Sequence, residues 1–293
     1  MPDPHKELSD LKAEKEFFIG IDSDGCAFDT MEIKHKECFC PQTIKHWDLQ
    51  AVSKYARETW DFVNLYSKTR GTNRFPALLR VLDLLRVRKE VVARNVKVVD
   101  LPILRQWAKE ETKLGNPALE AKVQATNDPE LKRVLAWSKD INKMIAEWVH
   151  SVPPFPLVRE SLGKAREKAD LIVVSQTPGE ALKREWQEHK IDGLVRFIAG
   201  QECGTKTEHI KYGAGGKYSK DKVLMIGDAI GDLDAAKGNN ALFFPIIPGE
   251  EEKSWELFFN EGLDKFFSGK FAGKYEEKLI KRLHARLPES PSW

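Results

Sequence analysis

The stretch FFIGIDSDG, residues 17–25, is an apolar run that ends at two carboxylates, Asp22 and Asp24. The stretch VLMIGDAIGD, residues 223–232, is a second apolar run that ends in acids. Short apolar runs of this kind are typical of buried strands. A strand that ends in carboxylates brings negative charge to one edge of a sheet, where a cation must neutralise it or the pKa of the acids must shift. The two stretches together predict an acidic site at the edge of a buried sheet.

Length and composition restrict the class of protein. The chain has 293 residues, which is enough for about two domains. Its 41% hydrophobic and 31% charged residues are typical of a globular protein, and its net charge of +2 gives no electrostatic basis for binding nucleic acid. No apolar stretch approaches the roughly 20 residues that span a bilayer, and residues 1–6 lack the apolar core of a signal peptide. We therefore expect a cytoplasmic protein without a nucleic-acid or membrane partner.

Four cysteines in a chain of this length do not form a disulfide framework. Cys38 and Cys40, with His35 and His46 nearby, can be interpreted as zinc ligands or as ordinary packing thiols. Their spacing matches no standard zinc pattern, which favours packing.

Residues 47–150 have a helical period, with apolar residues three and four positions apart in three successive stripes. The third stripe is preceded by Asp128 as an N-cap and by Pro129 at the first helical position. No strand-like alternation of comparable strength occurs in this range. Three prolines within residues 153–156 then form a stiff connector. This pattern predicts an inserted, all-helical domain.

Strands and helices alternate again after the connector. Strands are expected at residues 17–22, 171–174, 195–199, 223–226 and 241–245. Continuous apolar strands that alternate with helices predict an α/β fold, with a parallel sheet covered on both faces. Ligands bind such sheets at the carboxyl ends of the strands, where Asp22, Asp24, Ser175 and Asp228 fall. The glycine-rich residues 213–217 lack the first glycine of a phosphate loop, so we interpret them as a turn.

The strand-end residues are suited to phosphoryl transfer, which needs a nucleophile, a proton donor, a divalent cation and positive groups around the transferring oxygens. Asp22 can be the nucleophile. Asp24 can protonate the leaving oxygen and later deprotonate water. Ser175 can donate to a phosphate oxygen, and Lys206 can offset the negative charge that develops.

The same acids predict a magnesium site. Mg²⁺ prefers a few carboxylates together with water and phosphate oxygens. Asp22 and Asp228 can supply the carboxylates, and the backbone carbonyl of Asp24 can be a third ligand. Asp232 is the further candidate for the metal site. Asp232 could instead have a supporting or helix-capping role. Asp234 is the other candidate for the same position in the metal site.

The order of these motifs is similar to that of the haloacid dehalogenase-like hydrolase superfamily. The four motifs of that superfamily are resembled here by Asp22-x-Asp24, Ser175, Lys206 and Gly227-Asp228-x-x-x-Asp232. The resemblance covers residues 16–30 and about 152–250, and the helical block lies where that superfamily places its first type of cap. The proline that often follows the motif lysine is missing after Lys206. Lys211, Lys217 and Lys222 are therefore the alternatives for this motif.

The resemblance implies a Rossmannoid catalytic core, residues 16–30 and 151–250, with a large helical cap, residues 31–150. A C-terminal helical extension, residues 251–293, is expected to pack on the core. Within the superfamily, Asp24 implies a magnesium-dependent phosphatase that acts on a small phosphorylated metabolite through an aspartyl-phosphate. A phosphosugar mutase shares this second aspartate and is the alternative. A non-catalytic binding or scaffold protein that retains the fold is the alternative of another class.

The predicted cap contains a cationic turn, residues 67–74. Lys68, Arg70 and Arg74 would suit a second anionic group on the substrate. The alternative is a solvated turn between two helices. We expect a monomer or a homodimer, because the aromatic residues of the C-terminal extension fit either a helix packed on the core or an oligomer contact.

Overall fold

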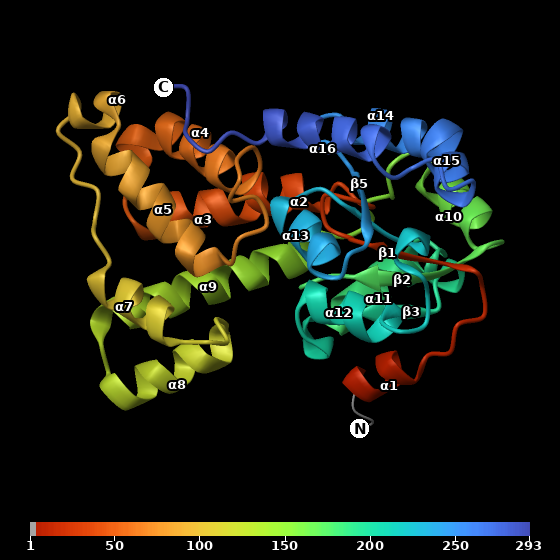
Figure 1. Ribbon diagram of the computed structural model, residues 1–293. Coiled ribbons are helices and arrows are strands. Elements are labelled where there is room, and N and C mark those ends of the chain that lie inside the picture. Colours follow the sequence, from red (N-terminus) through yellow and green to blue (C-terminus); the bar gives the residue numbers. More distant parts are fainter. Residues whose placement is uncertain (1–3) are drawn as a thin grey trace. The chain divides into compact units, whose positions relative to one another are not determined.

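The computed structural model describes residues 4–293 (Figure 1). The chain divides into two compact units. The core unit comprises the residues up to Met31 together with Ser151–Leu287, and the helical unit comprises Glu32–His150 together with Pro288–Trp293. Each unit has its own hydrophobic interior.

A five-stranded sheet forms the centre of the core unit. Its strands are β1 (Phe17–Ile21), β2 (Ala169–Val174), β3 (Phe197–Ala199), β4 (Val223–Gly227) and β5 (Leu242–Pro245). All neighbours pair in parallel in the order β3-β2-β1-β4-β5, and Ile21 lies opposite both Val173 and Ile226. This order follows the doubly wound pattern in which ligands bind at the carboxyl ends of the strands. The α/β fold class predicted from the sequence is confirmed.

Both faces of the sheet are buried because successive side chains of a strand point to opposite sides. Phe17, Ile19 and Ile21 pack in one apolar cluster with α10 (Val158–Ala165) and with Trp186 of α11 (Gly179–Glu188). Phe18 of the same strand packs on the other side. Its cluster includes residues of α12 (Lys206–Ala214), α13 (Ile230–Gly238) and, at Leu8, α1 (Pro4–Asp10).

Helices also follow the last strand. They are α14 (Glu251–Leu257), the π-helical Phe258–Gly262, α15 (Leu263–Phe267) and α16 (Lys274–Arg286). The aromatic residues of this region fill the core: the ring centroids of Phe17 and Phe266 are 5.1 Å apart, and those of Phe244 and Phe258 are 4.9 Å apart. The Trp255 indole N–H donates to the Cys26 carbonyl at 2.8 Å, close to the end of β1.

Residues 288–293 depart from the predicted extension on the core. They pack on the helical unit, where the Arg88 guanidinium lies 4.3 Å from the Trp293 ring and 4.8 Å from the Tyr55 ring. A segment of six residues is too short to have a period, so this change of partner leaves no pattern in the sequence.

The helical unit begins with a helix whose middle part, Lys34–Phe39, is a π-helix and whose last part is α3 (Cys40–His46). The longer helices that follow are α4 (Ser53–Asn64), α5 (Arg74–Val87), α7 (Pro102–Glu110), α8 (Asn116–Thr126) and α9 (Pro129–Trp148). Asp128 caps α9, as predicted, by accepting the Leu131 N–H at 3.0 Å. The interior is rich in large aromatic side chains, including Trp60, Phe75, Trp107 and Trp137.

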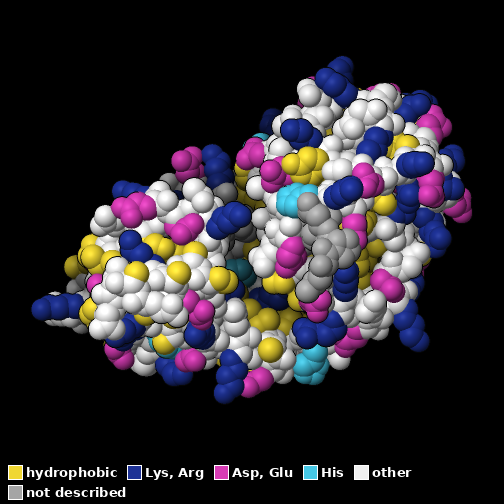
Figure 2. Space-filling view, turned by 90° about the horizontal axis from the view of Figure 1, so that it is seen from below, with side chains coloured by type: hydrophobic (Ala, Val, Ile, Leu, Met, Phe, Trp, Pro, Cys, Tyr) yellow, Lys and Arg dark blue, Asp and Glu magenta, His cyan; other side chains and the backbone are white. Residues whose placement is uncertain are grey.

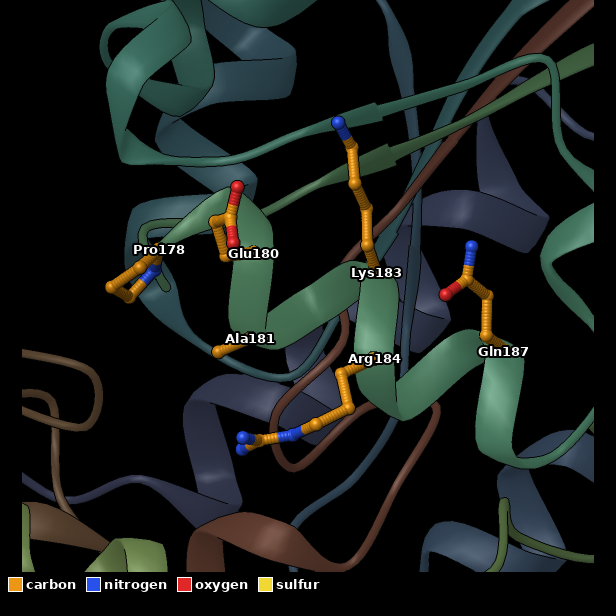
Figure 3. A pocket seen from close by; sticks show the side chains of 6 residues that line it. All are labelled: Pro178, Glu180, Ala181, Lys183, Arg184 and Gln187. Atoms are coloured by element: carbon orange, nitrogen blue, oxygen red, sulfur yellow. The ribbon is translucent and has the colours of Figure 1, made fainter.

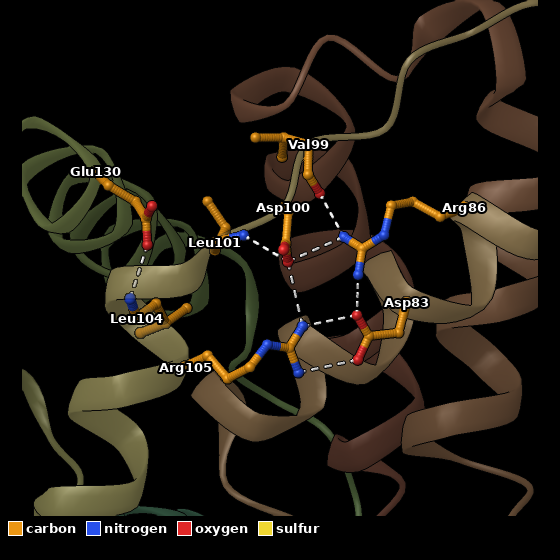
Figure 4. Close-up of polar contacts among 8 residues, drawn as sticks. All are labelled: Asp83, Arg86, Val99, Asp100, Leu101, Leu104, Arg105 and Glu130. Carbon is orange, nitrogen blue, oxygen red and sulfur yellow. Dashed lines mark hydrogen bonds and ion pairs between the residues drawn. The ribbon is translucent and has the colours of Figure 1, made fainter.

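An ion-pair network ties α5 to α7 in the helical unit (Figure 4). The Arg105 guanidinium binds both oxygens of Asp83, at 3.1 and 2.7 Å, and Arg86 binds Asp83 and Asp100. The Val99 carbonyl accepts from Arg86 at 2.9 Å. Single exposed pairs contribute little to stability, but this network holds the segment before α7 at several points.

The surface shows no single sign of charge on the face in view. Lys and Arg side chains are interspersed with Asp and Glu side chains there (Figure 2). Among the residues that the structure describes, no helix is both long and apolar enough to cross a bilayer. The four cysteines are buried and free.

Candidate active site

The ends of β1 and β4 bring the predicted acids together. The Asp22 N–H donates to the Ile226 carbonyl at 3.0 Å, which continues the β1–β4 pairing one residue beyond the strand. Gly227 then leaves room for Asp232, because a Cβ atom at position 227 would lie 2.4 Å from the Asp232 Cβ and Cγ atoms. The Asp232 side chain accepts the backbone N–H groups of Asp228 and Ala229, at 3.1 and 3.0 Å. The loop after β4 is therefore folded around Asp232.

Lys206 joins two of these acids. Its Nζ atom lies 2.6 Å from Asp22 Oδ2 and 2.6 Å from Asp232 Oδ1. The lysine is placed by a capping box at the start of α12, where the Thr205 hydroxyl accepts the Glu208 N–H and the Glu208 carboxylate accepts the Thr205 N–H. Both oxygens of Asp232 are thus used inside the protein. This geometry matches the supporting role that the sequence left open for Asp232.

Lys211, the first of the other lysines considered for this motif, is exposed on α12, and the remaining two have different partners. Lys217 donates to the backbone carbonyls of Ser9 and Tyr212, and Lys222 pairs with Glu16. Asp234, which competed with Asp232 in the sequence, is exposed, whereas Asp232 is completely buried. The structure therefore brings Lys206 and Asp232, rather than these alternatives, to Asp22.

The site holds more negative than positive charge. Burial raises the pKa of Asp22 well above its usual range; Lys206 opposes this rise, while Asp232 and Asp228 add to it. Burial alone would lower the pKa of Lys206, but Asp22, Asp232 and Asp228 outweigh it and raise this pKa. We conclude that Lys206 stays protonated. Burial is the main cause of the raised pKa of Asp22, and Asp232 and Asp228 add to it. Three carboxylates share one ammonium group, so the site favours a further cation.

The donor set fits a magnesium ion. Asp22, Asp228 and Asp232 are buried, and one oxygen of each lies within 4.8 Å of the others. Asp22 and Asp228 could supply carboxylate oxygens to one Mg²⁺, whereas both oxygens of Asp232 already bond Lys206 and backbone N–H groups. Among the described residues, the cysteine and histidine positions considered for zinc belong to no such group. His35 instead stacks on Phe39, at 4.8 Å between ring centroids.

Two threonines that the sequence did not single out hold Asp24. The Thr177 hydroxyl donates to Asp24 Oδ2 at 2.8 Å, and the Thr30 hydroxyl donates to Asp24 Oδ1. A hydroxyl can both donate and accept, so these partners suit the ionised and the protonated acid. Thr177 follows Ser175 by two residues, and Thr30 begins a helix. Their positions next to known motifs were the available signal, but neither residue type is specific enough to be chosen.

Ser175 lies directly after β2 and is buried. Its N–H donates to the Ala199 carbonyl at 3.0 Å, and its hydroxyl accepts the Thr177 N–H at 3.2 Å. The segment from Ser175 to Thr177 therefore leads from β2 to the Asp24 carboxylate.

A cavity of about 560 Å³ runs along the outer side of α11 (Figure 3). Its lining residues are Pro178, Glu180, Ala181, Lys183, Arg184 and Gln187. Two cations among them make this outer side polar, whereas Leu182 and Trp186 of the same helix are buried. The helix thus has one polar, solvent-exposed face and one apolar face that packs on the core.

The cations of the turn 67–74 have partners within the helical unit. Lys68 forms an exposed ion pair with Glu289 at 3.0 Å. Arg70 is buried and donates to the Leu65 carbonyl at 2.9 Å. Arg74 donates to Ser138 and Asn142 of α9, and burial lowers its pKa to about 10.

Comparison with known proteins gives structural matches only. No family model matches the sequence, and a search of curated proteins gives no match. Solved structures that match include a predicted phosphoglycolate phosphatase from Haemophilus somnus, at 14% identity over 80% of this chain and 86% of that chain, with a TM-score of 0.46. A haloacid dehalogenase superfamily hydrolase of subfamily IA from Geobacter sulfurreducens matches at 13% identity over 80% and 90%, with a TM-score of 0.40. CbbY from Rhodobacter sphaeroides, in complex with phosphate, matches at 17% identity over 78% and 84%, with a TM-score of 0.42.

Proposed function

We propose that this protein is a hydrolase of the haloacid dehalogenase-like type, a magnesium-dependent phosphatase that acts on a small phosphorylated metabolite through an aspartyl-phosphate. The observation that carries the proposal is the contact of the Lys206 ammonium with Asp22 and Asp232, at 2.6 Å each, beside Asp228. Clustered acids cost stability, and a catalytic role explains why they are gathered around one lysine.

In the proposed first step, an Asp22 carboxylate oxygen attacks phosphorus and the bond from phosphorus to the ester oxygen breaks. Asp24 gives its proton to that oxygen, so the alcohol leaves neutral. In the second step a water molecule attacks phosphorus and gives a proton to Asp24. The bond from phosphorus to the Asp22 oxygen breaks, which releases inorganic phosphate and restores the Asp22 carboxylate and the protonated Asp24.

Residues around the two acids support these steps. Lys206 holds Asp22 in place and offsets charge on the phosphoryl oxygens. Thr30 and Thr177 orient Asp24 in both protonation states. We assign the metal site to Asp22, Asp228 and the Asp24 carbonyl, with Asp232 supporting it through Lys206. Mg²⁺, when bound there, would neutralise the phosphate oxygens and orient them for attack.

The proposal extends to the turn 67–74, where we divide the roles of the three cations. Arg70 and Arg74 are engaged in the interior of the helical unit and hold the shape of the turn. Lys68 pairs with an exposed carboxylate, which an anionic group of the substrate could replace at low cost. A cytoplasmic location remains a prediction from the sequence.

A screen of phosphorylated metabolites with released phosphate as the readout tests this function. We expect hydrolysis of at least one small phosphomonoester. Activity should disappear with a chelator and return with Mg²⁺, whereas Ca²⁺ should support it poorly because of its higher coordination number. Retention of the phosphoryl group on a sugar phosphate, without release, would indicate the mutase alternative. Full activity after exhaustive chelation would contradict the proposal.

A further inference from the structure

Ser23, between the two catalytic candidates, is attached to α11 by its side chain. It is completely buried. Its hydroxyl donates to Glu185 Oε2 at 3.0 Å and accepts the Trp186 indole N–H at 3.0 Å. Successive side chains in an extended segment point to opposite sides, so Ser23 points away from the side on which Asp22 and Asp24 act.

The backbone of Ser23 is fixed as well. Its carbonyl accepts the N–H groups of the next turn, at Cys26, Ala27 and Phe28, over 2.9–3.2 Å. Its own N–H donates to Asp22 Oδ1 at 2.8 Å. Every polar atom of Ser23 therefore has a partner, and Ser23 links the Asp22 carboxylate to the turn that contains Asp24.

Helix α11 and the segment before it hold this loop at two points. Thr177, before the helix, binds the Asp24 carboxylate, and Glu185 and Trp186, in its last turn, bind Ser23. Trp186 is itself fixed by complete burial and by an edge contact with Phe28, at 5.8 Å between ring centroids. The residues on the outer side of α11, shown in Figure 3, take no part in these contacts.

A buried polar contact of this kind has a cost that an apolar residue would avoid. A hydroxyl and a carboxylate removed from water are tolerated only when they are hydrogen-bonded, and their directional bonds then fix one arrangement. Packing alone could bury position 23 without a polar partner. The contacts present therefore define the orientation of the loop, which packing by itself would leave less determined.

We propose that Glu185 and Trp186 are positioning residues that act through the Ser23 hydroxyl and place Asp24 for proton transfer. This inference depends on the proposed phosphatase activity. Loss of the Ser23 contacts should misplace Asp24 relative to the leaving oxygen while Asp22, held by Lys206, stays in place. The variants should thus lose mainly proton donation by Asp24, and general acid–base catalysis of this kind contributes about 10²–10⁴-fold to the rate.

Two aryl esters of similar size, phenyl phosphate and p-nitrophenyl phosphate, separate proton donation from the rest of catalysis. Phenolate is the more basic leaving group and needs the proton more. For Ser23→Ala we expect kcat/KM to fall about tenfold more for phenyl phosphate than for p-nitrophenyl phosphate. Glu185→Leu and Trp186→Phe should show the same selective loss. Glu185→Gln, which keeps a carbonyl acceptor, should retain most of the activity on both esters.

Ser161→Ala is the matched control, since Ser161 is a completely buried serine of α10 whose hydroxyl has no hydrogen-bond partner among the described residues. It should leave both esters unaffected. If Ser23→Ala lowers kcat/KM equally for the two esters, or not at all, the positioning role is wrong. The phosphatase proposal would still stand in that case, provided that Asp22→Asn is inactive. A parent protein inactive on both esters, and on every metabolite tested, would overturn the proposed function and this inference together.

Discussion

The core unit and the helical unit use buried charge in different ways. In the core unit, Asp22, Asp228 and Asp232 gather around Lys206, and the group keeps an excess of negative charge. In the helical unit, Arg88 lies close to two aromatic rings and binds Glu58, and Arg74 binds residues of α9. Arg88 and Arg74 each bond residues of their own unit, whereas three carboxylates of the core group share one ammonium, as a site for a cation requires. The contrast locates chemistry in the core unit.

Replacement of the nucleophile should give the largest effect. In Asp22→Asn the amide keeps the shape of the side chain but cannot attack phosphorus, so we expect kcat to fall by at least about a thousandfold, which corresponds to about 4 kcal/mol. The fold should persist, because the substitution also removes one of three crowded carboxylates. Phosphate release and thermal unfolding measure the two outcomes. If Asp22→Asn kept activity close to that of the parent, Asp22 would not be the nucleophile, and the assignment of the chemistry to the core unit would be wrong.

Much of the core unit could be predicted because its signals are local. Each strand is a continuous apolar run, and parallel topology places the strand ends at one edge, so the sequence around Asp22 and Asp228 was sufficient to predict the sheet and the acids. The role of Thr30 and Thr177 could not be predicted, since it depends on how a turn brings hydroxyls to Asp24. The Ser23–Glu185 contact spans 162 positions and has no periodic pattern.

The helical unit was predictable in type but not in detail. The helical periods predicted an all-helical unit, and the N-cap at Asp128 predicted the start of α9. Arg74 bonds Ser138 and Asn142 of α9, whereas Arg70 bonds the nearby Leu65 carbonyl, and the sequence contains no local rule for either contact. A cationic turn looks the same in sequence whether its charges face a substrate or bind their own backbone.

Acid should weaken the core unit through His209. Burial, and then Lys206, lower the pKa of this completely buried histidine to about 4 from 6.5. The unfolded chain therefore takes up a proton before the folded one, so stability present above pH 6.5 is lost as the pH falls toward 4. The loss can reach about 3 kcal/mol. Denaturant unfolding at several pH values measures it, and His209→Leu should flatten the curve over this range.

Asp61 gives the opposite dependence in the helical unit. Burial raises its pKa to about 6 from 3.8, so the folded state holds the proton more tightly. The stabilisation is complete below pH 3.8 and is lost as the pH rises through 6. The Asp61 and His209 effects overlap between about pH 4 and 6 and have opposite slopes. Asp61→Asn should therefore steepen the loss of stability on acidification, whereas His209→Leu should flatten it. The same pH dependence for both variants would contradict the assignment of separate groups to separate units.

Gly227→Ala should disturb the core unit through close packing. The added Cβ would meet Asp232 at 2.4 Å, and Asp232 holds Lys206 and the loop after β4. We expect a loss of about 2 kcal/mol in unfolding free energy, together with lower kcat. Gly163→Ala is the control. It lies in α10, where the added Cβ would meet no described atom within 4 Å apart from its chain neighbours and the helix's own backbone, and alanine should stabilise this helix by up to about 1 kcal/mol. Equal stability of the two variants would show that Asp232 can move without cost.

The smallest effect is expected at Lys68, and it tests whether the helical unit contributes to substrate binding at all. Lys68 and Arg133 are matched, since each forms an exposed 3.0 Å ion pair within the helical unit, with Glu289 and Asp48. Exposed pairs contribute about 0–1 kcal/mol, so Lys68→Ala and Arg133→Ala should change stability little and equally. If the turn binds an anionic group of the substrate, only Lys68→Ala should raise KM, by a few-fold, on the best substrate of the metabolite screen. On p-nitrophenyl phosphate, which has no second anionic group, neither variant should change KM. An unchanged KM in Lys68→Ala on both substrates would assign the turn to structure alone and leave recognition to other parts of the protein.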